Sequence, residues 1–123
     1  MIERQWAMDF AHEWIAAWNS HDLERILSHY SENFEMSSPL IIERMGEPSG
    51  VLKGKAAMRP YWSQAVALEP PLRFELLEVL VGVRSITIYY RSIGRRVGAE
   101  VLEFNASREV VRAAAHHGPA DRG

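Results

Sequence analysis

Apolar residues in the first quarter of the chain recur with the period of an α-helix. Four aromatic residues, each four positions after the last, predict one buried face on a helix from about residue 3 to 19: Trp6, Phe10, Trp14 and Trp18. Residues 19–22 (NSHD) then favour a turn and a helix N-cap. A second, shorter helix is expected after them, with an apolar face formed by Leu23, Ile26, Leu27 and Tyr30.

In the next part of the chain the apolar and polar residues form shorter segments, and these segments differ in the element that they predict. Residues 33–38 (NFEMSS) alternate apolar and polar positions and end at Pro39, which predicts a short strand. Residues 40–42 (LII) either extend this strand or pair with it. After a loop rich in glycine and proline, residues 55–68 predict a third helix, in which Pro60 causes a late start or a kink.

The second half of the chain has the β-branched and aromatic pattern of strands. Four strands are predicted, at residues 72–81, 84–92, 97–105 and 109–117. The breaks between them, such as residues 94–96 (GRR), are short enough for hairpins and therefore suit an antiparallel sheet. Helices followed by strands predict an α+β fold, in which three helices from the N-terminal half pack on the concave face of a curved antiparallel sheet.

Composition narrows the class of protein. The length of 123 residues suits one domain at residues 1–117, followed by a flexible tail at residues 118–123. The chain has no cysteine, which excludes disulfides and thiol catalysis, and no run near the ~20 apolar residues that span a bilayer. A net charge of −2 with scattered arginines disfavours nucleic acid as a partner. We therefore expect a cytoplasmic protein that binds neither nucleic acid nor membrane.

Three segments of the sequence resemble one protein family. The string AWNSHDLERILSHYSENFEMSSP (residues 17–39) is similar to the opening of nuclear transport factor 2-like proteins, especially their SnoaL-like and ketosteroid-isomerase-like branches. GVLKGKAAMRPYW (residues 50–62) resembles the start of their third helix, and EVLEFNASREVVRAAAHH (residues 100–117) resembles their last hairpin. The resemblance implies a cone-shaped domain around an apolar pocket. It also implies relatives that include isomerases, cyclases, dehydratases, epoxide hydrolases and protein-binding members.

The resemblance also indicates where catalytic groups would stand. The ketosteroid-isomerase-like pattern implies a tyrosine on the first helix, a carboxylate base before the proline and a carboxylic acid on the penultimate strand. These positions are occupied here by Trp14, Ser38 and Glu100. Because Ser38 has no partner base, the general base is lost, whereas Glu100 keeps the carboxyl group. A steroid isomerase is therefore not expected.

Two further mechanisms of the family are not reproduced. The epoxide-hydrolase-like pattern implies an arginine two residues before the acid, where Gly98 stands. That pattern and the SnoaL-like cyclase pattern imply another acid on the last strand, where Ala113 and Ala115 stand. The resemblance therefore implies a fold but not an activity.

Strand parity identifies a candidate catalytic pair. Glu100 shares a strand face with Leu102 and Phe104, because alternate residues of a strand point to the same side. On the last strand, the face predicted to look into the cone carries Val111, Ala113, Ala115 and His117. Glu100 and His117 are thus expected to line the pocket, where the carboxylate would raise the pKa of the imidazole. The alternative is that Glu100 pairs with a surface arginine and His117 marks an exposed strand end.

Aromatic side chains supply most of the candidate pocket wall. The residues expected to contact a ligand are Trp14, Trp18, Tyr30, Met36, Ser38 and Trp62. Aromatic residues at helical spacing are usually core, so plain packing is the alternative for each ring. Where such rings line a cavity, they favour a flat, largely apolar or aromatic ligand.

Two functions remain open at this point. The first is an isomerase, cyclase or dehydratase in which Glu100 and His117 transfer protons, and the second is a non-catalytic ligand-binding or dimerisation module. The histidines lack the spacing of metal ligands, so no metal is expected, nor any other cofactor. A homodimer is expected, because both faces of the strand at residues 84–92 carry substantial side chains.

Overall fold

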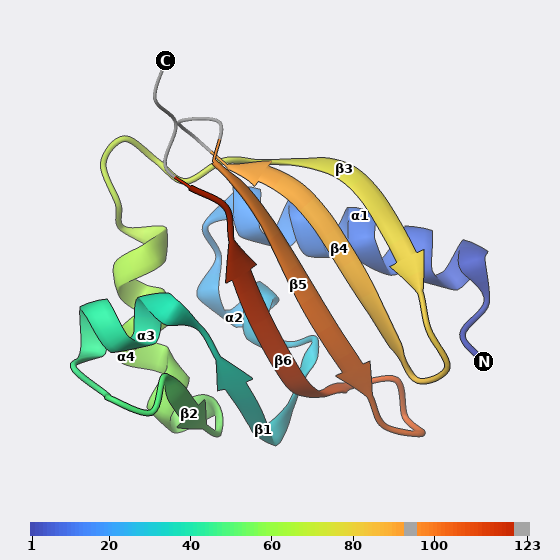
Figure 1. Ribbon diagram of the computed structural model, residues 1–123, viewed down its shortest axis with the longest axis horizontal. Coiled ribbons are helices and arrows are strands. Elements are labelled where there is room, and N and C mark those ends of the chain that lie inside the picture. The colour runs from blue at the N-terminus through green and yellow to red at the C-terminus, as the bar shows by residue number, and fades with distance from the viewer. Residues whose placement is uncertain (93–95, 120–123) are drawn as a thin grey trace.

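The computed structural model describes residues 1–92 and 96–119, in which four helices lie against a six-stranded sheet (Figure 1). The helices are α1 (Arg4–Ser20), α2 (Leu23–Leu27), α3 (Pro39–Met45) and α4 (Lys55–Val66). The strands are β1 (Tyr30–Ser37), β2 (Val51–Lys53), β3 (Phe74–Val81), β4 (Ser85–Ser92), β5 (Val97–Phe104) and β6 (Val110–His117). The strand order is β2-β1-β6-β5-β4-β3. This architecture confirms the predicted α+β class, with one helix more than expected.

The helices pack on the sheet in two groups. Helix α1 packs against β3 and passes behind the long strands, while α3 and α4 lie beside β1 and β2 (Figure 1). The buried residues of α1 follow the predicted helical stripe: Ala7, Ala11, Trp14, Ala17 and Trp18. Trp6 and Phe10 on the same stripe are partly buried and pack against Phe104 of β5. Among the described residues, no helix is long and apolar enough to cross a bilayer.

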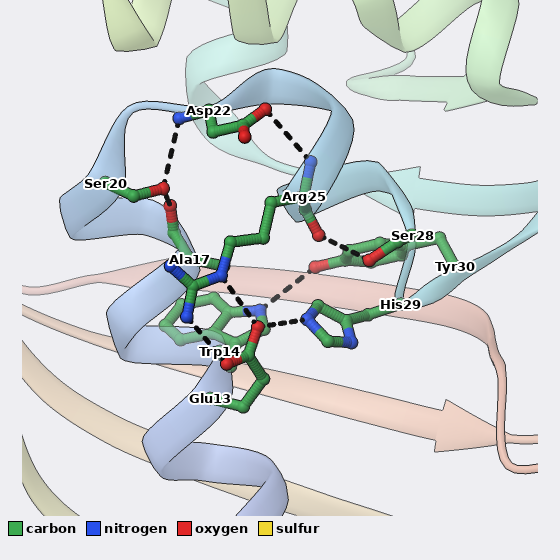
Figure 2. Close-up of polar contacts among 9 residues, drawn as sticks. All are labelled: Glu13, Trp14, Ala17, Ser20, Asp22, Arg25, Ser28, His29 and Tyr30. Atoms are coloured by element: carbon green, nitrogen blue, oxygen red, sulfur yellow. Dashed lines mark hydrogen bonds and ion pairs between the residues drawn. The ribbon is translucent and has the colours of Figure 1, made fainter.

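The polar turn after α1 joins the first two helices. Asp22 caps α2 by accepting hydrogen bonds from the backbone N–H groups of Glu24 and Arg25. Arg25 then donates two hydrogen bonds back to Glu13 of α1, at 2.8 and 3.0 Å (Figure 2). This forked contact fixes the angle between α1 and α2, because a guanidinium matches both oxygens of a carboxylate.

The same turn holds the start of β3. The amide nitrogen of Asn19 donates to the carbonyl oxygen of Phe74 at 2.9 Å, and its Oδ1 atom accepts from the Phe74 N–H at 2.7 Å. Nε2 of His21 lies 2.7 Å from the carbonyl oxygen of Leu72. These contacts attach residues 72–74 to the end of α1. The residues that the sequence indicated as turn formers therefore also position a part of the sheet distant in sequence.

Residues 40–42 belong to helix α3, so the expectation that they extend or pair with a strand is wrong. Ser38 caps this helix by accepting a hydrogen bond from the Leu40 N–H at 3.1 Å, and Pro39 occupies its first turn. Proline suits that place because its fixed φ is helical and its missing N–H would have no partner there. Gly46 ends the helix with φ at 66°. These caps outweigh the strand propensity of the Leu-Ile-Ile run.

Helix α4 begins where the sequence predicted, so of the two expected effects of Pro60, a late start or a kink, the late start does not occur. Gly54 precedes it with φ at 86°, and its carbonyl accepts a hydrogen bond from the Met58 N–H at 3.1 Å. Pro60 lies in the interior of the helix. Residues 51–53, for which the sequence predicted no strand, form β2 and pair with β1.

Strands β3 to β6 form the predicted antiparallel pairs, but the sheet is not antiparallel throughout. Strand β1 runs parallel to β6, with Met36 beside Ala113. All of β2 to β5 lies between these two strands in sequence, and such a long connection permits parallel pairing. The predicted turn at residues 94–96 and tail at residues 118–123 fall largely outside the described residues.

A buried hydrogen bond gives a test of this core. Nε1 of Trp14 donates to the Tyr30 hydroxyl at 3.0 Å, and both side chains are fully buried (Figure 2). Tyr30→Phe leaves that N–H without a partner, so we expect the free energy of unfolding in urea to fall by about 1–3 kcal/mol. Tyr89→Phe is the control, because Tyr89 is 39% exposed, and should change it by less than about 0.5 kcal/mol. Equal stabilities of the two variants would contradict this account.

Candidate functional site

A cavity of about 340 Å³ lies at the end of the sheet where β1, β4 and β6 finish and β5 begins. The C-terminal end of α1, helices α3 and α4, and the loop between α4 and β3 complete its wall. Its volume is at the lower end of the range for small-molecule sites. Six of the eight site residues predicted from the sequence line it: Trp18, Met36, Ser38, Trp62, Glu100 and His117.

The other two predicted residues, Trp14 and Tyr30, lie in the core behind the wall. Trp14 stands one turn before Trp18 on α1, and its ring stacks on Phe74, which does line the cavity. Tyr30 meets the Trp62 ring at a centroid distance of 5.0 Å. Helical spacing placed Trp14 on the correct face of α1 but could not show which turn of that helix reaches the cavity. Tyr30, predicted on the apolar face of the second helix, is instead the first residue of β1, because α2 ends at Leu27.

The cavity also contains residues that the sequence analysis did not propose for the site. Tyr61 and Tyr90 contribute phenol groups, and Phe74 contributes a ring. Tyr90 lies on the same face of β4 as the buried Ile88, so strand parity could have identified it. No signal in the sequence marks the arginines of the wall, which come from three separate segments: Arg44, Arg73 and Arg96.

Glu100 is buried in the cavity wall with 7% of its surface exposed. It lies opposite Ile88 on β4 and Ala115 on β6, and neither neighbour can pair with a charge. Its Oε2 atom has no hydrogen-bond partner, and burial raises its pKa to about 8. Glu100 is therefore protonated at neutral pH. Because it forms no ion pair within the described part of the chain, the alternative of a surface arginine as its partner is wrong.

The tyrosines near Glu100 also keep their protons. Burial raises the pKa of Tyr30, Tyr61 and Tyr90, and an ionised Glu100 would raise each of them further. Two of these phenols line the cavity and one lies behind it. The polar groups on this side of the cavity are therefore neutral hydrogen-bonding groups rather than charges.

His117 stands at the end of β6, opposite Gly98 of β5. Its Nε2 atom is buried and has no hydrogen-bond partner among the described residues. Burial lowers the pKa of His117, and the charges of Arg96 and Arg44 are among those that lower it further. The sequence predicted that Glu100 would raise the pKa of His117, and this expectation is wrong. A protonated carboxyl group has no negative charge with which to stabilise an imidazolium. The imidazole is therefore neutral near pH 7 and able to accept a proton.

The orientation of β5 agrees with the prediction, whereas that of β6 agrees only in part. Alternate residues of β5 are buried, with Glu100 inward. In β6, Ala113 and Ala115 are buried as predicted, but the first inward residue is Val110 rather than Val111. A register shift between β5 and β6 near this point, as in a β-bulge, reverses the parity.

Three buried polar side-chain atoms among the described residues have no hydrogen-bond partner, and all three belong to cavity residues: Trp18 Nε1, Glu100 Oε2 and His117 Nε2. Leaving one such group unpaired costs about 1–3 kcal/mol. Native proteins rarely leave several of them in one place. Their convergence is typical of a site whose missing partners come from a bound molecule or from water.

Comparison with known proteins shows which family the chain belongs to. A family model described as the SnoaL-like domain matches residues 11–120. This chain belongs to the SnoaL-like family. A SnoaL-like protein of unknown function from Burkholderia thailandensis E264 is 47% identical, with a TM-score of 0.92 over 96% of this chain and 98% of that chain. No curated protein matches the sequence significantly. The resemblance inferred from the three sequence segments is confirmed.

More distant structures share the fold. SalBIII, an epoxide hydrolase/cyclase-like enzyme with a role in pyran ring formation in the polyether salinomycin, is 18% identical, with a TM-score of 0.75 over 98% of this chain and 97% of that chain. A proposed isomerase of the SnoaL-like family from Agrobacterium tumefaciens C58 is also 18% identical, with a TM-score of 0.74 over 94% and 99% of the two chains. At such identities the likeness extends to the fold alone.

In this SnoaL-like chain, Ser38 supports the fold as well as lining the cavity. Its hydroxyl caps α3 by accepting from the Leu40 N–H, and its proximity to the Tyr61 phenol partly offsets the larger, burial-driven rise in the pKa of Tyr61. Both contacts use the hydroxyl, and no base stands beside it among its described contacts. Ser38 therefore positions α3 and Tyr61 rather than replacing the carboxylate base that the resemblance implies at this place.

Gly98 occupies the place where the epoxide-hydrolase-like pattern implies an arginine. A Cβ atom at this residue would lie 2.7 Å from both Cζ and the hydroxyl oxygen of Tyr90. Real side chains do not tolerate such distances, so any residue larger than glycine would displace the Tyr90 ring. The ring thus fills the space that an arginine at this position would need.

The stability of this SnoaL-like protein should depend on pH through Glu100. Between the ordinary glutamate pKa of 4.5 and the folded value of about 8, the folded state holds a proton that the unfolded state releases. Below this window the protonated Glu100 carboxyl costs the folded state no extra free energy. As the pH rises through the window, the free energy of unfolding falls by a few kcal/mol, in order of magnitude. Urea denaturation across the window should show the wild type losing stability relative to Glu100→Gln, which cannot titrate. A difference that does not vary with pH would contradict the raised pKa.

Proposed function

We propose that this protein is an enzyme that moves protons within a small, largely apolar molecule, as an isomerase, cyclase or dehydratase does. Glu100 is the acid and His117 is the base. The observation that supports this proposal is the presence, in one cavity, of a carboxyl group that keeps its proton and an imidazole that lacks one. Environments that shift two groups in opposite directions assign acid and base roles at neutral pH.

The wall of the cavity suits a flat substrate. The rings of Trp18 and Trp62 meet edge to face at 5.2 Å, and those of Phe74 and Tyr90 lie 4.4 Å apart. Such a wall binds ring systems through apolar contact. The unpaired Trp18 N–H can donate a hydrogen bond to a substrate oxygen, which would orient the molecule between the two titrating groups.

The proton balance of this reaction needs no further reagent. Nε2 of His117 removes a proton from an activated C–H or O–H group of the substrate, while the Glu100 carboxyl donates its proton to a carbonyl or hydroxyl oxygen. In a dehydration, the protonated hydroxyl leaves as water. His117 is then protonated and Glu100 ionised, and proton exchange with solvent restores both.

A thermal-shift screen provides substrates for the test. Polycyclic aromatics, steroids, terpenoids and short acyl compounds cover the flat and apolar classes, and a ligand of the folded state raises the melting temperature by mass action. With a compound that is converted, Glu100→Gln and His117→Gln should each lower kcat by ~100-fold or more while KM changes little.

Glu103→Gln is the matched control for these variants. Glu103 lies on the same strand as Glu100, but with opposite parity, and its carboxylate is 3.8 Å from Arg112 on the outer side of the sheet. This change should leave kcat unaltered. An equal loss of kcat in Glu103→Gln and Glu100→Gln would contradict the assigned acid.

A non-catalytic ligand-binding module is the second candidate, and one observation favours it. At the place where the resemblance implies the base, Ser38 is engaged by α3 and Tyr61. Such a module would still give a thermal shift with its ligand, but incubation would yield no product. Glu100→Gln would then change only the affinity.

We also propose that the outer face of the sheet forms a homodimer interface. Tyr89, which is 39% exposed, lies beside Ala99, while Val101 lies between Thr87 and Ala114. A face of small apolar side chains around an aromatic ring is more apolar than a solvated sheet face usually is. Sedimentation equilibrium at micromolar concentration should give twice the chain mass of 14.0 kDa, and Val101→Glu should give the single mass. A monomeric wild type would refute the interface.

A further inference from the structure

Three arginines from separate segments line the cavity: Arg44 near the end of α3, Arg73 just before β3 and Arg96 just before β5. Arg44 and Arg73 are exposed, and within residues 1–92 and 96–119 neither forms an ion pair or a side-chain hydrogen bond. Elsewhere in the protein six arginines each pair with a glutamate: Arg4, Arg25, Arg59, Arg91, Arg108 and Arg112. The arginines that line the cavity thus lack an acidic partner within the described part of the chain.

Arg96 is held in place beside His117. Its Nε atom donates to the carbonyl oxygen of Gly118 at 2.8 Å, and Gly118 directly follows His117 at the end of β6. This bond uses one edge of the guanidinium, and no contact to a described side chain uses the two Nη groups. The charges of Arg96 and Arg44 reach the cavity interior, since both help burial to lower the pKa of His117, while the charge of Glu43 opposes them.

The charge of the cavity is opposite to that of the whole chain. The chain has a net charge of −2. The cavity wall contains three arginines and two glutamates, and one of these glutamates, Glu100, is neutral because it is desolvated. Glu69 is the other glutamate of the wall, so the arginines outnumber the acids that could balance them, which leaves an excess of positive charge around an otherwise apolar cavity.

We propose that the ligand of this cavity is an organic carboxylate, an inference that rests on the proposed function for the existence of a small-molecule site. Its apolar ring system lies against the aromatic wall, and its carboxylate is bound by Arg44, Arg73 and Arg96. Guanidinium groups bind carboxylates through paired N–H···O bonds. A planar carboxylate presents two oxygens to the paired N–H groups of a guanidinium, and it can be attached directly to a flat ring system of the kind that the aromatic wall binds. The rest of the molecule then reaches Glu100 and His117.

The test uses three pairs of probes with matched shapes: benzoate and benzamide, 2-naphthoate and 2-naphthamide, and anthracene-2-carboxylate and its amide. Within each pair that binds, calorimetric titration at low salt should show the carboxylate binding about tenfold or more tightly than the amide. This preference should shrink as sodium chloride is added, because salt screens exposed charges.

Two arginine variants identify the groups responsible. The double variant Arg44→Gln/Arg73→Gln should lower the affinity for the carboxylate about tenfold and leave that for the amide unchanged. Arg84→Gln is the matched control, because Arg84 is an exposed arginine without an acidic partner in the described residues and lies outside the cavity, between β3 and β4. It should change neither affinity.

The outcomes separate this inference from the proposed function. Equal affinities within a pair, or a preference that survives in the double variant, would overturn the carboxylate assignment while the small-molecule cavity stands. If none of the six probes binds at millimolar concentration, the carboxylate inference is overturned. The proposed function is decided separately, by the thermal-shift screen and by the turnover of the Glu100→Gln and His117→Gln variants.

Discussion

When the protein folds, the carboxyl group of Glu100 loses its hydration and gains no basic partner among the described residues. Its neighbours on β4 and β6 are Ile88 and Ala115, whose apolar side chains cannot replace the hydrogen bonds that water gives to a carboxylate. The proton therefore stays on the carboxyl group near neutral pH. Because Glu100 is neutral, no carboxylate there raises the pKa of His117. Burial and the charges of the arginines lower that pKa instead, so the imidazole loses its proton more easily.

The geometry of the cavity depends on short polar contacts that lie far from Glu100 in sequence. Asn19 attaches Phe74 to the end of α1 and thereby places Arg73 at the cavity. The Ser38 cap starts helix α3, which brings Arg44 to the same opening. Caps and turns that stabilise the fold therefore also determine which charges surround the site.

Local periodicity predicted those parts of the molecule in which local preference and tertiary packing agree. The stripe of α1, the strands β3 to β6 and the inward direction of Glu100 belong to this group. Helix α3 was missed because its caps outweigh the propensity of residues 40–42. The core position of Trp14 and the direction of the His117 pKa shift depend on contacts between distant segments, which no single stretch of sequence contains.

The protonation state of Glu100 can be measured directly. Carbon-13 NMR of the glutamate side-chain carboxyls, with the Glu100 signal assigned by its absence from Glu100→Gln, follows this one group as the pH changes. The account predicts that the signal titrates near pH 8, well above the ordinary glutamate value of 4.5. Titration close to 4.5 would mean that Glu100 is ionised at neutral pH, and it would contradict both the acid role and the neutral carboxyl group on which that role depends.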